Sequence, residues 1–246
     1  AVTTLLDTKI DSELILVKIN NKNRLGGSIF SEVYKQDVDN TPDIDDVSSF
    51  MKLFNKTQSL IADKKIHALH DISDGGLIVT ISELAFTARQ GINIDLDQII
   101  EVGNSLNQVL FNEEIGLILQ IEKSNVDLVL NQYLDQNLFA CRIGEMNAKK
   151  SINLSLNNKE IFSETIINLE NSWREVSHAM QSIRDNKESA DSELSLIKEG
   201  YSGLFAKDSF VDPDVSSFNI KSTKPKVAIL REQGVNGQME LSLIHI

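Results

Sequence analysis

The chain of 246 residues is long enough for one large domain, or for one domain and part of another. Its 41% hydrophobic and 24% charged residues are ordinary for a soluble globular protein. A net charge of −12 repels nucleic-acid phosphates and disfavours a nucleic-acid-binding role. We find neither an apolar run of membrane-spanning length nor a secretory leader, so we expect a cytoplasmic protein with no nucleic-acid or membrane partner.

The first part of the chain alternates between predicted strands and helices. Short apolar runs at residues 14–19 and 66–69 are typical of strands. A helix over residues 29–35 is expected to begin with Ser28 as its cap. Residues 43–63 have the spacing of an amphipathic helix, whose apolar positions are Val47, Phe50, Met51, Phe54 and Ile61.

The strongest helical pattern follows two glycines. It comprises Leu77, Ile81, Leu84, Ala85 and Ala88. Further strands are predicted over residues 92–96, 117–121, 139–143 and 151–156, with a helix over residues 126–134. The single cysteine, Cys141, excludes an internal disulfide, and its apolar surroundings indicate a buried small hydrophobic residue rather than a reactive thiol.

The pattern changes after Ser163. A long helix is predicted there, with an apolar stripe that indicates core packing and comprises Leu169, Trp173, Val176, Met180 and Ile183. Residues 185–219 are polar, acidic and weakly periodic, as in a connection between domains. Pro225 then precedes a well-defined predicted strand at residues 226–231, which begins a new structural unit.

The turn at residues 70–76 carries the residues best suited to chemistry. Its paired glycines, Gly75 and Gly76, permit positive φ and allow a ligand to approach the backbone closely. The helix that follows offers free N–H groups and a positive dipole end to an anion such as phosphate. Asp71 and Asp74 are hard oxygen ligands, which suit Mg²⁺ held between a carboxylate and a phosphate.

An alternative interpretation of this turn needs no ligand. Ser73 or Asp74 would cap the helix, the glycines would make the turn, and His70 would fill space. The sequence has no GxxxxGK[ST] loop and no GxGxxG fingerprint, so a nucleotide would have to bind by another scheme. Glu113 and Glu114 could coordinate or orient a ligand, but adjacent strand residues point to opposite faces, so we expect at least one of the two to be solvated and favour a role in solvent over a functional one.

Six segments, in order, resemble the phosphoribosylformylglycinamidine synthase family, the large single-chain form of formylglycinamidine ribonucleotide synthetase. They are residues 25–34, 70–86, 110–116 (as the entry to a buried strand), 143–145, 173–186 and 225–237. The last segment is the most specific, because it is similar to the opening of the family's glutaminase domain. The resemblance covers nearly the whole chain.

The resemblance implies an α/β (α+β) fold in which helices pack on a mixed sheet, like the C-terminal lobe of aminoimidazole ribonucleotide synthetase. The first strand of a class I glutaminase domain would follow. We expect residues 1–160 to form the synthetase C-terminal lobe, residues 161–222 a long helix and linker, and residues 223–246 a truncated start of the glutaminase domain. The upstream synthetase and downstream glutaminase domains would be its partners.

The family converts formylglycinamide ribonucleotide, glutamine and ATP into formylglycinamidine ribonucleotide, glutamate, ADP and phosphate. Carried over by position, Asp71 matches the family's Mg²⁺ ligand and Ser73 matches a nucleotide contact. Gly75 and Gly76 are backbone candidates for the same ATP or ADP site, which could serve turnover or be auxiliary. The resemblance assigns no role to His70 or Asp74.

We expect no catalytic residue in this chain and no activity from the fragment alone. The Cys, His and Glu of the family's glutaminase would lie beyond its end, since Cys141 is far upstream and His245 is too close to the glutaminase start. Two alternatives stay open. One is a non-catalytic scaffold lobe, and the other is a relative of aminoimidazole ribonucleotide or selenophosphate synthetase, against which residues 225–237 argue.

Overall fold

The computed structural model describes residues 2–36, 40–100, 104–198 and 237. Its strands are β1 (Ser12–Lys18), β2 (Ala68–Asp71), β3 (Gly91–Asp95), β4 (Gly116–Glu122), β5 (Phe139–Asn147), β6 (Ser151–Leu156) and β7 (Lys159–Thr165). Its helices are α1 (Ile29–Val33), α2 (Val47–Ala62), α3 (Gly76–Ala88), α4 (Leu106–Phe111), α5 (Val126–Leu134), α6 (Ile166–Arg184) and α7 (Lys187–Lys198), with a short 3-10 helix, η1, at Lys123–Asn125.

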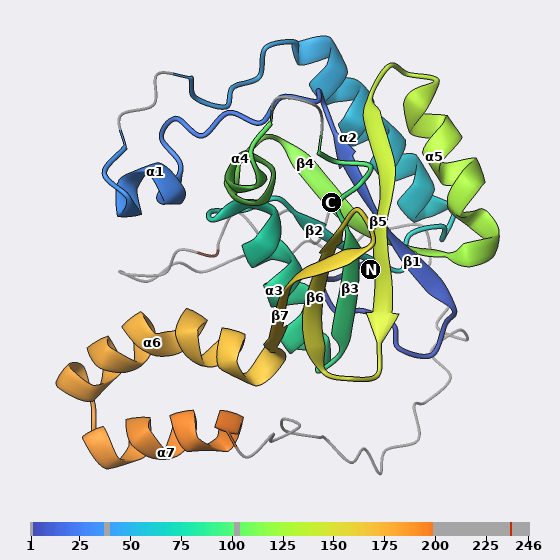
Figure 1. The fold of residues 1–246 in the computed structure, drawn as a ribbon. Coiled ribbons are helices and arrows are strands. Elements are labelled where there is room, and N and C mark those ends of the chain that lie inside the picture. Colours follow the sequence, from blue (N-terminus) through green and yellow to red (C-terminus); the bar gives the residue numbers. More distant parts are fainter. Residues whose placement is uncertain (1, 37–39, 101–103, 199–236, 238–246) are drawn as a thin grey trace, which may run out of the picture. The chain divides into compact units, whose positions relative to one another are not determined.

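The described strands form one seven-stranded sheet in the order β2-β4-β1-β5-β3-β6-β7 (Figure 1). Neighbouring strands are antiparallel except β3 and β6, which run parallel. The predicted mixed sheet with helices packed on it is therefore confirmed. The expected glutaminase strand at residues 226–231 lies outside the described residues. In the described ranges, every helix is too short or too polar to cross a membrane.

Both faces of the central strand β1 are buried, which explains its unbroken apolar run. Leu14 and Leu16 join a core formed with α3 and α4, whereas Ile15 and Val17 join a second core formed with α2 and α5. Each such side chain contributes about 1.5–3 kcal/mol when it is fully removed from water. The two cores hold the helices against opposite faces of the sheet and so fix where α3 begins.

Tyr133 of α5 is fully buried against α2, and its hydroxyl lies 2.9 Å from Thr57 Oγ1. Burial raises the pKa of Tyr133 to about 12. The ordinary tyrosine pKa is about 10, so the unfolded chain loses this proton first as the pH rises. The stability that depends on the neutral phenol is therefore complete below about pH 10 and is lost as the pH approaches about 12.

We expect the free energy of unfolding to fall by about 3 kcal/mol between these pH values on account of Tyr133, since each pKa unit is worth about 1.4 kcal/mol. Urea denaturation at a series of alkaline pH values measures this loss. In Tyr133→Phe, which cannot ionise, the decline should be smaller by that amount. Parallel declines in the two proteins would contradict the prediction.

Cys141 confirms the prediction of a buried, unreactive thiol. Its side chain is buried in the first core. Burial raises the pKa of the Cys141 thiol to about 12, so the thiol is protonated at neutral pH.

The predicted apolar face of α2 is only partly correct, because Phe50 and Ile61 pack against the second core whereas the other three predicted positions do not. Its periodicity is helical, but its fully buried residues are Leu53, Thr57 and Leu60. The predicted apolar positions Val47, Met51 and Phe54 are exposed instead. The sheet and α5 lie against the other side of the helix, and the sequence pattern alone could not show which side they would cover.

The apolar stripe of α6 is not core, contrary to the prediction. Leu169 packs against the first core, but Val176, Met180 and Ile183 are exposed, Ile183 to 88%. Helix α6 contacts α3, β7 and α7, and α7 lies beside Trp173, Arg174, Ser177, His178 and Gln181 rather than over the three exposed residues.

Three further elements differ from the sequence prediction. The segment after residue 185, expected to be a polar connection, contains α7. Strand β7 was not predicted, and it extends the sheet by pairing with β6. Helix α4, which Ser105 and Gln108 start with a reciprocal capping box, was not predicted. Residues 110–116 begin with the end of this helix and lead into the buried strand β4, as expected.

Candidate functional site

Residues 71–75 of the glycine turn line an open hollow of about 770 Å³. Strand β2 lies at the edge of the sheet and ends at Asp71, which is paired with Leu117 of β4. The chain then turns into α3, so Asp71, Ser73 and Gly75 share one wall of the hollow. The Asp71 carboxylate is 76% exposed and is therefore available to a ligand. We call this space the Asp71 hollow.

Glu83 of α3 organises the polar groups of the Asp71 hollow. Its Oε2 lies 3.0 Å from His70 Nε2 and accepts a long hydrogen bond of 3.4 Å from Ser73 Oγ. Its Oε1 accepts a hydrogen bond from Trp173 Nε1 at 3.0 Å. His70 Nδ1 in turn lies 2.8 Å from the Asp71 carbonyl oxygen. Both ring nitrogens of His70 therefore have polar partners, so this side chain belongs to the polar network of the hollow and is not only a packing residue.

Glu113 supplies the anion at the start of α3. Its Oε1 accepts hydrogen bonds from the backbone N–H groups of Gly75, at 2.8 Å, and Ile29, at 2.9 Å. The N-cap residue of α3 is Gly75, so the alternative in which Ser73 or Asp74 caps the helix is wrong. A carboxylate at this end of a helix is favourable because it meets the positive end of the helix dipole.

The two glycines of the turn do different things. Both have positive φ, 87° at Gly75 and 74° at Gly76, as the sequence predicted. Gly75 lines the hollow. At Gly76, a Cβ would lie 2.6 Å from the Asn112 carbonyl oxygen, so glycine is needed there for backbone packing against the end of α4. Gly76 thus allows the turn to pack closely against the end of α4.

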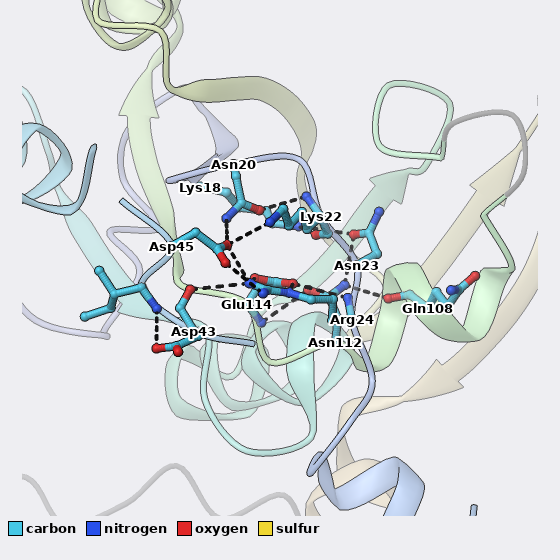
Figure 2. Close-up of polar contacts among 11 residues, drawn as sticks. Lys18, Asn20, Lys22, Asn23, Arg24, Asp43, Asp45, Gln108, Asn112 and Glu114 are labelled. Atoms are coloured by element: carbon cyan, nitrogen blue, oxygen red, sulfur yellow. Dashed lines mark hydrogen bonds and ion pairs between the residues drawn. The ribbon is translucent and has the colours of Figure 1, made fainter. Parts of the chain in front are cut away.

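Glu114 is buried, whereas its neighbour Glu113 is partly exposed. Its side chain is 1% exposed, and it accepts hydrogen bonds from Arg24 Nε at 2.6 Å and Arg24 Nη2 at 2.8 Å (Figure 2). Arg24 also reaches Asp45 Oδ2 at 3.0 Å. Hydrogen bonds to these carboxylates, of which the one to Glu114 has the largest effect, raise the pKa of Arg24 further above its ordinary value. The pair anchors the segment that presents Glu113 to the hollow.

The donor set of the Asp71 hollow suits a magnesium ion that is shared with a phosphate. Among residues 2–36, 40–100 and 104–198, no group of three or more His, Cys, Asp and Glu side chains could hold a metal by itself. Mg²⁺ requires less, because it commonly keeps several waters and binds through one or two carboxylates and phosphate oxygens. The exposed Asp71 carboxylate can provide one such ligand. Asp74 is also exposed and lines the same hollow.

Comparisons with known proteins agree with this fold. Residues 9–157 match the family described as AIR synthase related protein, C-terminal domain. The chain is 38% identical over 238 residues to phosphoribosylformylglycinamidine synthase of Schizosaccharomyces pombe, a match that covers 94% of this chain and 18% of the relative. The chain thus spans about a fifth of the length of that curated relative.

Solved structures of PurL from Thermotoga maritima also resemble the described fold. The complex with FGAR matches with a TM-score of 0.56 and 14% identity, over 68% of this chain and 29% of that chain. The complex with ATP matches with a TM-score of 0.52 and 13% identity, over 67% of this chain and 26% of that chain. At such low identity the likeness establishes the shared fold.

Proposed function

Because this chain belongs to the family of AIR synthase related proteins, of which it carries the C-terminal domain, we propose that it is the C-terminal synthetase lobe of a phosphoribosylformylglycinamidine synthase. The proposed enzyme is a cytoplasmic ATP-dependent carbon–nitrogen ligase of purine biosynthesis, with glutamine as the amide donor. The similarity to the Schizosaccharomyces pombe relative over 94% of this chain supports this proposal.

The proposed reaction has two steps in the synthetase. The amide oxygen of formylglycinamide ribonucleotide attacks the γ-phosphorus of ATP, and ADP leaves. Ammonia released from glutamine then attacks the activated carbon, and phosphate leaves with the former amide oxygen. The ammonia would come from the downstream glutaminase domain, and an upstream synthetase lobe would complete the site, so the isolated chain is expected to be inactive.

In this proposal the Asp71 hollow holds the phosphates of a nucleotide. Asp71 would ligate Mg²⁺, which supplies positive charge between the phosphates and a chain of net charge −12. Ser73 can exchange its long hydrogen bond to Glu83 for one to a nucleotide oxygen, and the backbone of Gly75 lies on the same wall. The observation that carries the proposal is the 76% exposure of the Asp71 carboxylate on the rim of this hollow.

Substituting Asp71→Asn should weaken Mg-ADP binding by about 10- to 100-fold, because it removes the charge of a metal ligand without changing the size of the side chain. The measurement is isothermal titration calorimetry on the full-length protein that carries this chain. Asp135→Asn is the matched control, since Asp135 is exposed at the end of α5 and does not line the hollow.

Unchanged affinity in Asp71→Asn would remove Asp71 from the metal site. If the unsubstituted protein bound no nucleotide in the presence of Mg²⁺, the non-catalytic scaffold lobe would be the better interpretation. A melting temperature that rises with Mg-ADP in the unsubstituted protein, and less in Asp71→Asn, gives an independent readout of the same binding.

A further inference from the structure

Helix α6 supplies part of the wall of the Asp71 hollow, although it lies far along the chain from the turn. Its Trp173, the single tryptophan of the chain, lines the hollow together with Glu83 of α3. The Trp173 ring also packs on that of Phe86, with 5.4 Å between the ring centroids. An ion pair between Arg89 and Glu170 joins the same two helices. The Trp173 indole is therefore held against α3 by both apolar and charged contacts.

A continuous series of polar contacts leads from Trp173 to the backbone of Asp71. Trp173 Nε1 donates a hydrogen bond to one oxygen of Glu83, and the other oxygen lies 3.0 Å from His70 Nε2. His70 Nδ1 lies 2.8 Å from the Asp71 carbonyl oxygen. The His70 side chain is only 14% exposed, so water competes little for these contacts.

Asp71 is placed where such support matters. It is the last residue of β2, at the edge of the sheet, where a strand has a ladder partner on one side only. The series of contacts through His70 therefore adds a constraint at the point from which the Asp71 carboxylate projects into the hollow. Both oxygens of Glu83 already have partners within the protein, so Glu83 can support this point without contacting a ligand.

We propose that Glu83 and Trp173 are positioning residues for the Asp71 carboxylate. This inference rests on the proposed function, in which Asp71 ligates Mg²⁺. Glu83 fixes the His70 ring and, through it, the backbone at Asp71, while Trp173 fixes Glu83. A ligand group that is held in place before the metal arrives loses less conformational freedom on binding. Helix α6 thus contributes to metal binding at a turn that it follows at a distance in the chain.

The test is a double-mutant cycle on Mg-ADP binding, measured by isothermal titration calorimetry on the full-length protein that carries this chain. Glu83→Gln keeps the size of the side chain but removes its charge, and it should weaken binding about 10- to 100-fold. Trp173→Phe keeps an aromatic ring but removes the N–H group, and it should weaken binding about 10-fold. Adding Glu83→Gln to Asp71→Asn should cause little further loss, because the positioned ligand has already gone.

A second readout separates positioning from a merely structural role. With ADP in excess, the Mg²⁺ concentration that gives half-maximal binding should rise in Glu83→Gln by about the same factor as the Mg-ADP dissociation constant. Glu175→Gln is the matched control, since Glu175 is exposed on α6 and does not line the hollow. It should leave both quantities unchanged. A circular-dichroism melt checks the fold of each variant, and if Glu83→Gln did not fold, Trp173→Phe would carry the same test.

Three results would overturn the inference. If Glu83→Gln caused as large a loss in the Asp71→Asn background as in the unsubstituted protein, Glu83 would not act through Asp71. Unchanged Mg-ADP affinity in Glu83→Gln and Trp173→Phe, with Asp71→Asn still impaired, would remove the positioning role and leave the proposed function standing. Absence of Mg-ADP binding by the unsubstituted protein would remove the proposed function, and the positioning role with it.

Discussion

Replacing Arg24 with methionine is expected to lower the free energy of unfolding by about 3–5 kcal/mol, because it leaves the buried Glu114 carboxylate without its partner. The Arg24 side chain is itself only 16% exposed and makes two hydrogen bonds to this carboxylate (Figure 2). A charge that remains in a low-dielectric interior costs more than the lost attraction alone. Urea denaturation of the full chain measures the loss.

Lys22→Met is the matched control for Arg24→Met. Lys22 also pairs with Asp45, at 3.0 Å, but its side chain is half exposed and water screens the pair. We expect a loss of no more than about 1 kcal/mol from Lys22→Met. Adding Glu114→Gln to Arg24→Met should restore part of the stability, because no charge is then buried unpaired. Equal losses in Arg24→Met and Lys22→Met would contradict the assignment of Glu114 as a buried charge.

Replacing Gly76 with alanine is expected to cost about 3 kcal/mol or more of folding free energy. Two effects add at this position. A left-handed φ of 74° costs an alanine roughly 1–2 kcal/mol. The new methyl group would also lie 2.6 Å from the Asn112 carbonyl oxygen and 2.8 Å from the Phe111 Cα, and backbone atoms at the end of α4 cannot rotate away.

Gly75→Ala separates the two effects. Gly75 has a positive φ too, but its methyl group would meet the Val79 side chain, at 2.5 Å from Cγ2, and a side chain can shift more cheaply than backbone. We therefore expect a loss of about 1–2 kcal/mol from Gly75→Ala, with urea denaturation as the measurement. If the two alanine variants were equally stable, close backbone packing would not be the reason for glycine at position 76.

The strongest local patterns in the sequence predicted elements accurately. The helix at residues 126–134 and the strand at residues 151–156 have the bounds of α5 and β6. Ser28 caps α1 as expected. Helical spacing, alternation and capping operate within a few residues of the chain, so the sequence contains all the information that they need.

Which face of a helix is buried depends on contacts with distant parts of the chain, not on neighbouring residues. In α2 and α6 the helical period was right, yet Phe54 and Ile183 are exposed. An apolar stripe is buried only where another element covers it, and the neighbouring elements cover only part of each stripe: Phe50 and Ile61 in α2 and one side of Trp173 in α6.

The candidate site divides in the same way. The sequence alone predicted the turn itself, with the Asp71 carboxylate, the Ser73 hydroxyl and the positive φ of both glycines. These features depend only on residue type and on close neighbours in the chain. Only the tertiary structure decided the groups that surround the turn. Glu113 meets Gly75 across 38 residues, and Trp173 meets Glu83 across 90 residues. The periodicity of the sequence cannot predict such pairings, because they form only when packing of the two cores brings separate segments of the chain together.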